Sequence, residues 1–211
     1  MKKKISLLLF LLHLSVLPVF SADIGENRLR SVDLYILLSR LDLDRPELGA
    51  VKTSYGNPAI VARELLKYYK SRTSPGYAAG LRGKDEDRAG VDEEYAREWC
   101  SQFIDRTKKN PGGGDDHKNA WRSVETGIRA CSRTALFQYF IDSPHFNAEV
   151  LVAFLNSMYD YAAYLMTEDG NNSGRTLMEA EGLACTAIFF PEFRESEIWR
   201  EEAFRIMSVQ N

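Results

Sequence analysis

The sequence predicts an all-α fold. No segment alternates apolar and polar residues for long enough to indicate a β-strand. Apolar residues recur instead at helical spacing along several stretches of similar length. Short breaks rich in proline, glycine or asparagine separate these stretches. We therefore expect neighbouring helices to pack against one another as antiparallel hairpins.

Residues 1–22 have the pattern of a secretory signal peptide. Three lysines precede an apolar run from Ile5 to Val19, and the small residues Ser21 and Ala22 follow where a signal peptidase would cut. The run is too short for a stable membrane span, and no later stretch is long and apolar enough to form one. We therefore expect a periplasmic or secreted protein with one helical domain at 23–211.

Composition and charge limit the kinds of partner. The chain has 211 residues, of which 45% are hydrophobic, enough for one well-buried domain. Without the three leader lysines, 24 of the 27 basic residues remain against 30 acidic residues, a net charge of −6. No basic stripe is present, so nucleic acid is not an expected partner. A polyanionic ligand would have to be held by a few local cations.

The first part of the domain contains two helical patterns and a linker. Leucines recur at helical spacing within 27–43, and Pro46 suits the first turn of a restart. A clearer start follows, because Asn57 can cap a helix at 59–70 and Pro58 can occupy its first turn. Residues 71–90 are rich in Gly, Ser and charge without a period, which indicates an internal linker.

Five further helices are predicted, separated by clear breaks. The helix at 91–109 places three aromatic residues on one face, and glycines at 110–117 end it. Helices are then expected at 120–141, at 148–166 after the cap Asn147, at 177–190 and at 196–207. The predicted buried stripe of the helix at 120–141 consists of Trp121, Val124, Ile128, Cys131, Ala135 and Tyr139.

The helix at 177–190 is the element around which the others are expected to pack. It is apolar on most sides, so other helices must surround it. Pro191 ends it, because proline cannot continue a helix interior. A polar loop at 169–175 precedes it, and such a loop is a common position for binding or catalytic residues.

Cysteine and histidine counts exclude several chemistries. Three cysteines, Cys100, Cys131 and Cys185, allow at most one disulfide, and their apolar surroundings favour buried free thiols. After the leader only His117 and His145 remain, in different loops. We therefore predict no metal site and no cofactor, and the counts disfavour Ser-His-Asp and Cys-His catalysis.

Two groups of residues suit carbohydrate binding. Trp121, Arg122, Glu125 and Arg129 lie on one side of a predicted helix, where an aromatic ring can stack on a sugar and charged groups can bind its substituents. The alternative is a core tryptophan with a structural Glu125–Arg129 pair, which spacing alone favours. The loop at 170–175 offers amides that could neutralise a carboxylate, or it is an ordinary capping loop.

Several stretches, taken in order, resemble the N-terminal domain of the heparinase II/III family, nearest to lyases of the heparinase III type. The resemblance covers most of residues 28–207. The stretches that carry it are 41–46 (LDLDRP), 62–72 (ARELLKYYKSR), 95–99 (YAREW), 120–128 (AWRSVETGI), 143–146 (SPHF), 150–157 and 177–193 with Trp199.

This resemblance implies an incomplete (α/α) toroid whose paired helices flank a substrate groove. Enzymes of this family cleave uronic-acid polysaccharides by β-elimination. A neutralised carboxylate makes the neighbouring carbon acidic, a Tyr or His base removes its proton, and an acid protonates the departing oxygen. The expected partner is thus an acidic polysaccharide such as a glycosaminoglycan, held by Trp121, Arg122, Glu125 and Arg129.

The chain departs from the family pattern in three places. The carboxylate-neutralising Asn is expected about five residues before Glu179, where Gly174 stands, so Asn172 is the residue assigned to that catalytic role. An aromatic-rich segment is missing between Arg72 and Tyr95. The chain ends before the expected Tyr, His and C-terminal β-sandwich, which would be a further partner. We therefore expect a weak or inactive lyase portion; the alternative is a non-catalytic acidic-glycan-binding or helical scaffold module.

Overall fold

A computed structural model describes residues 29–75, 92–109, 123–167 and 177–209. These residues form helices, and within these ranges the only β-pairing is an isolated bridge between Leu41 and Phe193. The all-α prediction is confirmed. No helix in this part of the chain has the length and apolar character needed to cross a bilayer.

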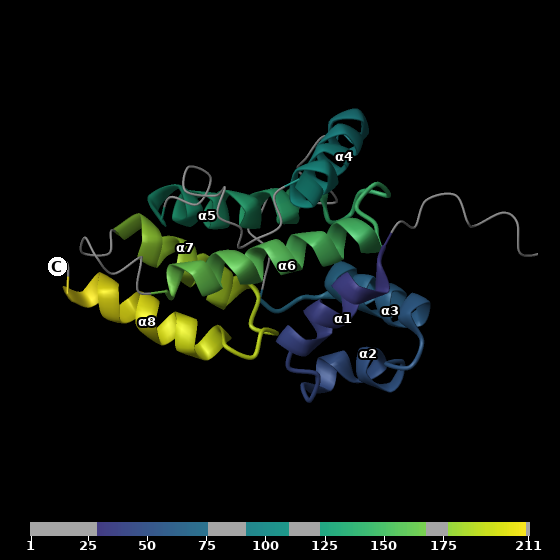
Figure 1. Ribbon diagram of the computed structural model, residues 1–211, viewed down its shortest axis with the longest axis horizontal. Helices are drawn as coiled ribbons and strands as arrows, with labels where there is room; N and C mark the ends of the chain where they lie inside the picture. The colour runs from purple at the N-terminus through teal and green to yellow at the C-terminus, as the bar shows by residue number, and fades with distance from the viewer. Residues whose placement is uncertain (1–28, 76–91, 110–122, 168–176, 210–211) are drawn as a thin grey trace, which may run out of the picture.

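The first helices form a unit at one end of the molecule (Figure 1). They are α1 (Ser31–Arg40), the short 3-10 helix η1 (Pro46–Leu48), α2 (Gly49–Thr53) and α3 (Pro58–Ser71). As the sequence predicts, the Asn57 side chain accepts a hydrogen bond from the Ile60 amide at 3.3 Å, and Pro58 occupies the first turn of α3.

The remaining helices form the larger part of the molecule. They are α4 (Glu93–Lys109), α5 (Ser123–Phe140), α6 (Ala148–Leu165), α7 (Leu177–Phe189) and α8 (Ser196–Val209). Figure 1 shows α5 to α8 running along the long axis, with α4 projecting from them. Asn147 caps α6 by accepting from the Val150 amide at 3.1 Å, and α7 ends before Pro191, as predicted.

The α7 helix is enclosed by its neighbours, which confirms its predicted place. It packs against α5, α6 and α8, and residues on most sides of it are buried. Its last turn meets an aromatic core centred on the buried Phe137. The ring centroids of Tyr69, Phe146, Phe154, Phe189 and Phe190 lie 5.2 to 6.0 Å from the centroid of Phe137. Such edge-to-face and tilted pairs stabilise a core beyond their buried area.

The predicted buried stripe of the helix at 120–141 is wrong. Val124 and Ile128 are 37% and 49% exposed. The face of α5 that is buried instead carries mostly small or polar side chains: Thr126, Gly127, Ala130, Thr134, Phe137, Gln138 and Phe140. The reason is that α5 approaches α7 too closely for large side chains, so hydrophobicity alone does not identify the contact face.

Candidate functional site

The candidate site is built on α5 and α7, which lie in direct backbone contact. A Cβ added to Gly127 would lie 2.3 Å from the Met178 carbonyl oxygen, and one added to Gly182 would lie 2.4 Å from the Gly127 Cα. Real Cβ atoms essentially never approach other atoms so closely. Both positions therefore require glycine, and the helix axes can approach only because neither residue has a side chain.

The two helices run in parallel. Gly127 near the start of α5 faces Met178 near the start of α7, while Phe137 near the end of α5 contacts Phe189 near the end of α7. The intervening α6 is antiparallel to α5, since Phe137 meets Phe154 and Arg133 meets Tyr161. The starts of α5 and α7 thus lie at the same end of the bundle (Figure 1).

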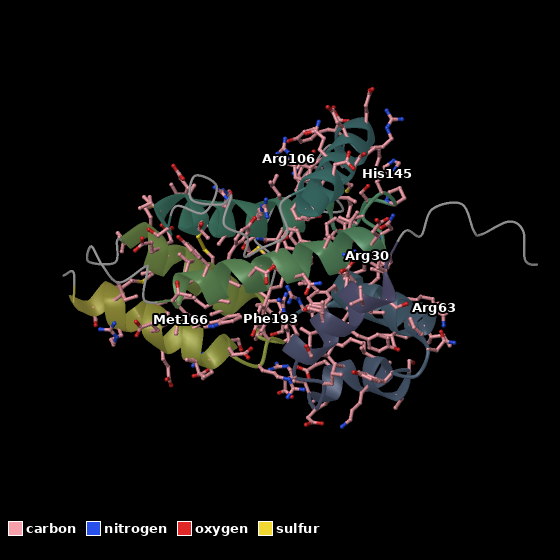
Figure 2. The ribbon with its side chains drawn as sticks, in the orientation of Figure 1. Arg30, Arg63, Arg106, His145, Met166 and Phe193 are labelled. Carbon is pink, nitrogen blue, oxygen red and sulfur yellow. A yellow bond between two sulfur atoms is a disulfide. The ribbon has the colours of Figure 1, made fainter. Side chains whose placement is uncertain are left out.

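A disulfide between Cys131 and Cys185 links α5 to α7 (Figure 2). The Cα atoms are 5.4 Å apart, within the usual range for a disulfide. The interpretation of all three cysteines as buried free thiols is therefore wrong for these two. It holds for Cys100, which is free and buried. Both half-cystines follow the glycine contact by one turn or less, so the close approach of the helices brings the sulfurs together.

The predicted site residues fall into two groups. Glu125 and Arg129 lie one turn apart on α5 and are half-buried. Trp121, Arg122 and Asn172 lie outside the described residues, as does most of the predicted linker at 71–90. In the sequence, Trp121 and Arg122 come just before α5 and Asn172 comes just before α7. All of the predicted site residues therefore belong to, or closely precede, two helices that start at the same end.

Arg129 belongs to a cationic cluster where α4, α5 and α6 meet. We use the name arginine cluster for Arg129, Arg133 and Tyr161. The Arg133 guanidinium lies between two buried rings, 4.9 Å from the centroid of Phe103 on α4 and 4.8 Å from that of Tyr161 on α6. The Tyr161 hydroxyl lies near the guanidinium groups of both Arg129 and Arg133. One neutral oxygen is therefore approached by two positive groups.

The electrostatics of the arginine cluster are unusual for a buried site. Burial lowers the pKa of Arg133, and the nearby charges of Arg129 and Arg106 lower it further. Burial raises the pKa of Tyr161, which the two cluster arginines oppose. Within the described part of the chain, no carboxylate forms an ion pair with Arg133, and its buried Nη1 has no hydrogen-bond acceptor. The cluster is thus suited to an anion.

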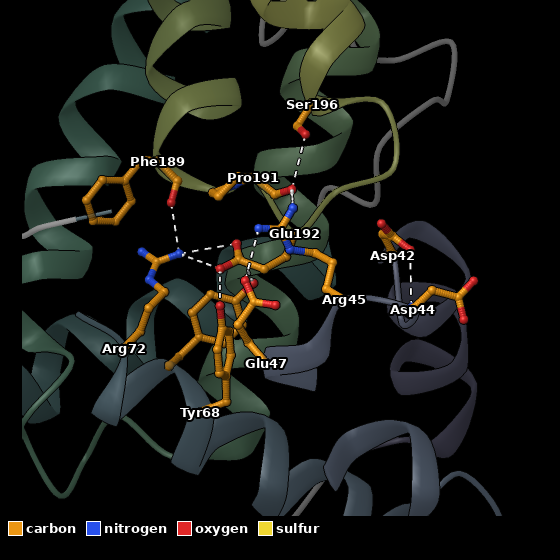
Figure 3. Close-up of polar contacts among 11 residues, drawn as sticks. Asp42, Asp44, Arg45, Glu47, Tyr68, Arg72, Phe189, Pro191, Glu192 and Ser196 are labelled. Atoms are coloured by element: carbon orange, nitrogen blue, oxygen red, sulfur yellow. Dashed lines mark hydrogen bonds and ion pairs between the residues drawn. The ribbon is translucent and has the colours of Figure 1, made fainter. Parts of the chain in front are cut away.

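Another arginine, Arg72, is buried and has a counter-charge (Figure 3). Its Nη1 donates to both carboxylate oxygens of Glu192, at 2.9 and 3.2 Å, and to the Phe189 carbonyl at 2.9 Å. The Tyr68 and Tyr69 hydroxyls donate to the same carboxylate at 2.6 and 3.3 Å. We call these four side chains the Glu192 junction.

The Glu192 junction is structural. Its ion pair is almost completely buried, with both side chains 1% exposed, so no substrate reaches it. Burial, and then the Glu192 charge, raise the pKa of both tyrosines and keep them as neutral donors. The junction fastens α3 to the turn between α7 and α8. The same turn is held by Arg45 and Ser196, which each donate to the Pro191 carbonyl at 3.2 Å.

The described ranges contain no group of three or more His, Cys, Asp or Glu side chains placed to hold an ion.

Sequence reasoning missed Arg133 and Tyr161. Arg133 follows Arg129 by four residues and so continues the side of the helix that carries Glu125 and Arg129. The four-residue spacing between Arg129 and Arg133 could therefore have identified Arg133 from the sequence. No sequence pattern identifies Tyr161, because its contact with α5 depends on how α6 packs against that helix.

Comparisons with known proteins agree with this architecture. Residues 86–211, more than half of the chain, match the family described as Heparinase II/III N-terminus. The chain is similar to heparin-sulfate lyases of Pedobacter heparinus, at 36% identity over 121 residues, and of Bacteroides stercoris, at 32% over 139 residues. These matches cover 56% and 57% of this chain but only 18% and 21% of the relatives. The chain thus spans about a fifth of their length.

Solved structures of similar proteins have the same fold. The "Heparinase III-BT4657 gene product" superposes with a TM-score of 0.72 and 23% identity, covering 88% of this chain and 41% of that one. Heparan sulfate lyase HepC from Pedobacter heparinus gives 0.68 and 23%, with coverage of 86% and 39%. The helices described above are therefore part of an (α/α) toroid, and the chain belongs to the heparinase II/III family.

Proposed function

We propose that this chain is the N-terminal helical module of an exported polysaccharide lyase that acts on uronic-acid glycosaminoglycans such as heparan sulfate by β-elimination. The observation that carries the proposal is the family match over residues 86–211. The convergence of α5 and α7 at one end supports it, because the segments with the predicted site residues join the bundle there.

The reaction assigns a task to each part of this module. Asn172 neutralises the uronate carboxylate, which makes the proton on the neighbouring carbon acidic. Trp121, Arg122, Glu125 and Arg129 line the groove and hold the polymer in register. The base that takes the proton and the acid that protonates the leaving oxygen come from other parts of a full-length lyase.

The module alone is inactive or only weakly active. This part of the proposal is supported by coverage, since the chain corresponds to about a fifth of each curated lyase that it resembles. Within the described ranges, His145 is the only histidine.

Export is supported by two features. The leader pattern at residues 1–22 predicts secretion. The Cys131–Cys185 disulfide is of a type that persists in oxidising compartments and is rare in the cytosol. Expression with the leader, followed by mass spectrometry of the protein recovered from periplasm and medium, tests this. Detection only in the cytosol with an intact leader would contradict export.

An absorbance assay for unsaturated uronide on heparan sulfate tests the rest. We expect no turnover by this chain and measurable binding to the same polymer. Trp121→Ala should remove most of the binding, because it deletes the stacking platform. Clear turnover by the chain alone would overturn the inactive-module proposal. Absence of both turnover and binding would instead favour a helical scaffold without a sugar site.

A further inference from the structure

We propose that the arginine cluster is a built subsite for the carboxylate or sulfate group of an acidic polysaccharide, in which Arg129 contacts the anion while Arg133 and Tyr161 position it. This inference rests on the proposed function, because it assumes that the ligand is an acidic glycan. It adds two residues, Arg133 and Tyr161, and places the subsite where α4, α5 and α6 meet.

The first argument is the absence of a counter-charge at Arg133. Arg133 is half-buried, but its Nη1 is removed from water, and a guanidinium nitrogen in that position normally has an acceptor because leaving it unpaired is costly. Among the described residues no carboxylate pairs with Arg133, and its Nη1 has no acceptor. The positive charge of Arg133 is therefore available to attract an anion that binds at the neighbouring Arg129.

The second argument is the fixed geometry of the group. Phe103 and Tyr161, each 5% exposed, hold the Arg133 guanidinium between their rings. Arg129 lies one turn before Arg133, near the Tyr161 hydroxyl, and is half-buried. Side chains held in this way lose little conformational freedom when an anion binds. The planar guanidinium also matches carboxylate and sulfate in shape.

The third argument is electrostatic. Although the chain carries a net charge of −3, the cluster gathers two arginines, and Arg106 on α4 is near enough to act on Arg133. The charges of Arg129 and Arg106 act together on Arg133, and Asp160 opposes the arginines at Tyr161. A polyanion would be directed to this place on the surface rather than spread over it.

Binding of a heparan sulfate hexasaccharide, measured by calorimetry as a function of salt, tests the subsite. Arg129→Met should weaken binding about tenfold, the loss of one charge-assisted contact. It should also make binding less sensitive to salt, since one cation fewer is neutralised. Arg133→Met should weaken binding less, about fivefold. The matched control is Arg63→Met on α3, which removes one exposed arginine away from the cluster and should change binding less than twofold.

Two further measurements separate binding from folding. Arg133→Met should leave the melting temperature unchanged or raise it, because a half-buried charge without a counter-charge is replaced by an apolar chain. A role in folding alone would lower it. Tyr161→Phe keeps the ring on Arg133 but removes the hydroxyl near Arg129, so it should weaken binding severalfold at unchanged stability. An unsulfated uronate hexasaccharide in parallel distinguishes the two anions: equal effects of Arg129→Met on both ligands indicate a carboxylate contact.

The outcomes separate this proposal from the proposed function. If the unsubstituted chain binds the hexasaccharide but Arg129→Met and Arg133→Met bind as Arg63→Met does, the subsite proposal is wrong and the proposal of a glycan-binding module stands. If the unsubstituted chain does not bind at all, both are wrong.

Discussion

Two arginines in this protein have similar aromatic surroundings but differ in charge balance; Arg72 is buried and Arg133 is half-buried. Arg72 lies over the rings of Tyr69, Phe189 and Phe190, and Arg133 lies between Phe103 and Tyr161. Arg72 is neutralised by Glu192 inside the core, whereas Arg133 pairs with no carboxylate among the described residues. Burial alone therefore does not distinguish structure from function, and the position of the counter-charge does.

The largest expected effect comes from breaking the neutralised pair. Glu192→Ala should destabilise the fold by about 3–5 kcal/mol, because it leaves Arg72 charged in a core that excludes water. Urea unfolding followed by circular dichroism measures this. The exposed Glu201→Ala on α8 is the control and should change the free energy of unfolding by less than about 0.5 kcal/mol. Equal effects of the two substitutions would mean that Glu192 is not a structural counter-charge.

Replacing Arg72 and Arg133 by methionine in turn should show how differently the two arginines contribute to stability. Arg72→Met should cost about 3–5 kcal/mol because it leaves Glu192 unpaired, whereas Arg133→Met should be neutral or stabilising by about 1 kcal/mol. Both variants are compared in one urea series. A loss at Arg133 as large as the loss at Arg72 would contradict the assignment of Arg133 to binding rather than to the core.

A smaller effect is expected at high pH. Burial raises the pKa of Tyr68 above its ordinary value, and the unfolded chain therefore gives up this proton first. The stability from the neutral hydroxyl is present below about pH 10 and is lost as pH rises toward the raised pKa. Tyr68→Phe should lower stability by about 1–2 kcal/mol at pH 7 and flatten the decline above pH 10. An unchanged decline in the variant would remove Tyr68 as its source.

Counting free thiols tests whether the Cys131–Cys185 disulfide joins α5 to α7. Burial raises the pKa of the Cys100 thiol to about 12, so it should resist alkylation in the folded protein at pH 8. Mass spectrometry should find no alkylated cysteine in the native protein, one after denaturation and three after denaturation with reductant. Three without reductant would show that Cys131 and Cys185 are not bonded.

The sequence predicts the helices well because capping and proline signals are local. Asn57, Asn147 and Pro191 each act on neighbouring residues, and each marks a helix end in the structure. The contact face of α5 was not predictable in the same way. Val124 and Ile128 are apolar but exposed, because Gly127 allows a backbone contact that no hydrophobicity pattern reports.

The site was predictable only in part for the same reason. Arg129 and Glu125 were found from helical spacing. The disulfide joins two cysteines that are 54 residues apart in the sequence. The contact of Tyr161 with Arg133 depends on the packing of α6 against α5. Such contacts are set by tertiary packing, so counting cysteines limits their pairing without selecting it.

The disulfide also has a consequence for resistance to proteolysis. It encloses α6 within a covalent ring, because Cys131 lies before that helix and Cys185 lies after it. A protease that cuts any single peptide bond between these cysteines opens the backbone without releasing a fragment. The nicked protein keeps its two pieces joined, and α6 stays tied to both neighbours until the disulfide is reduced.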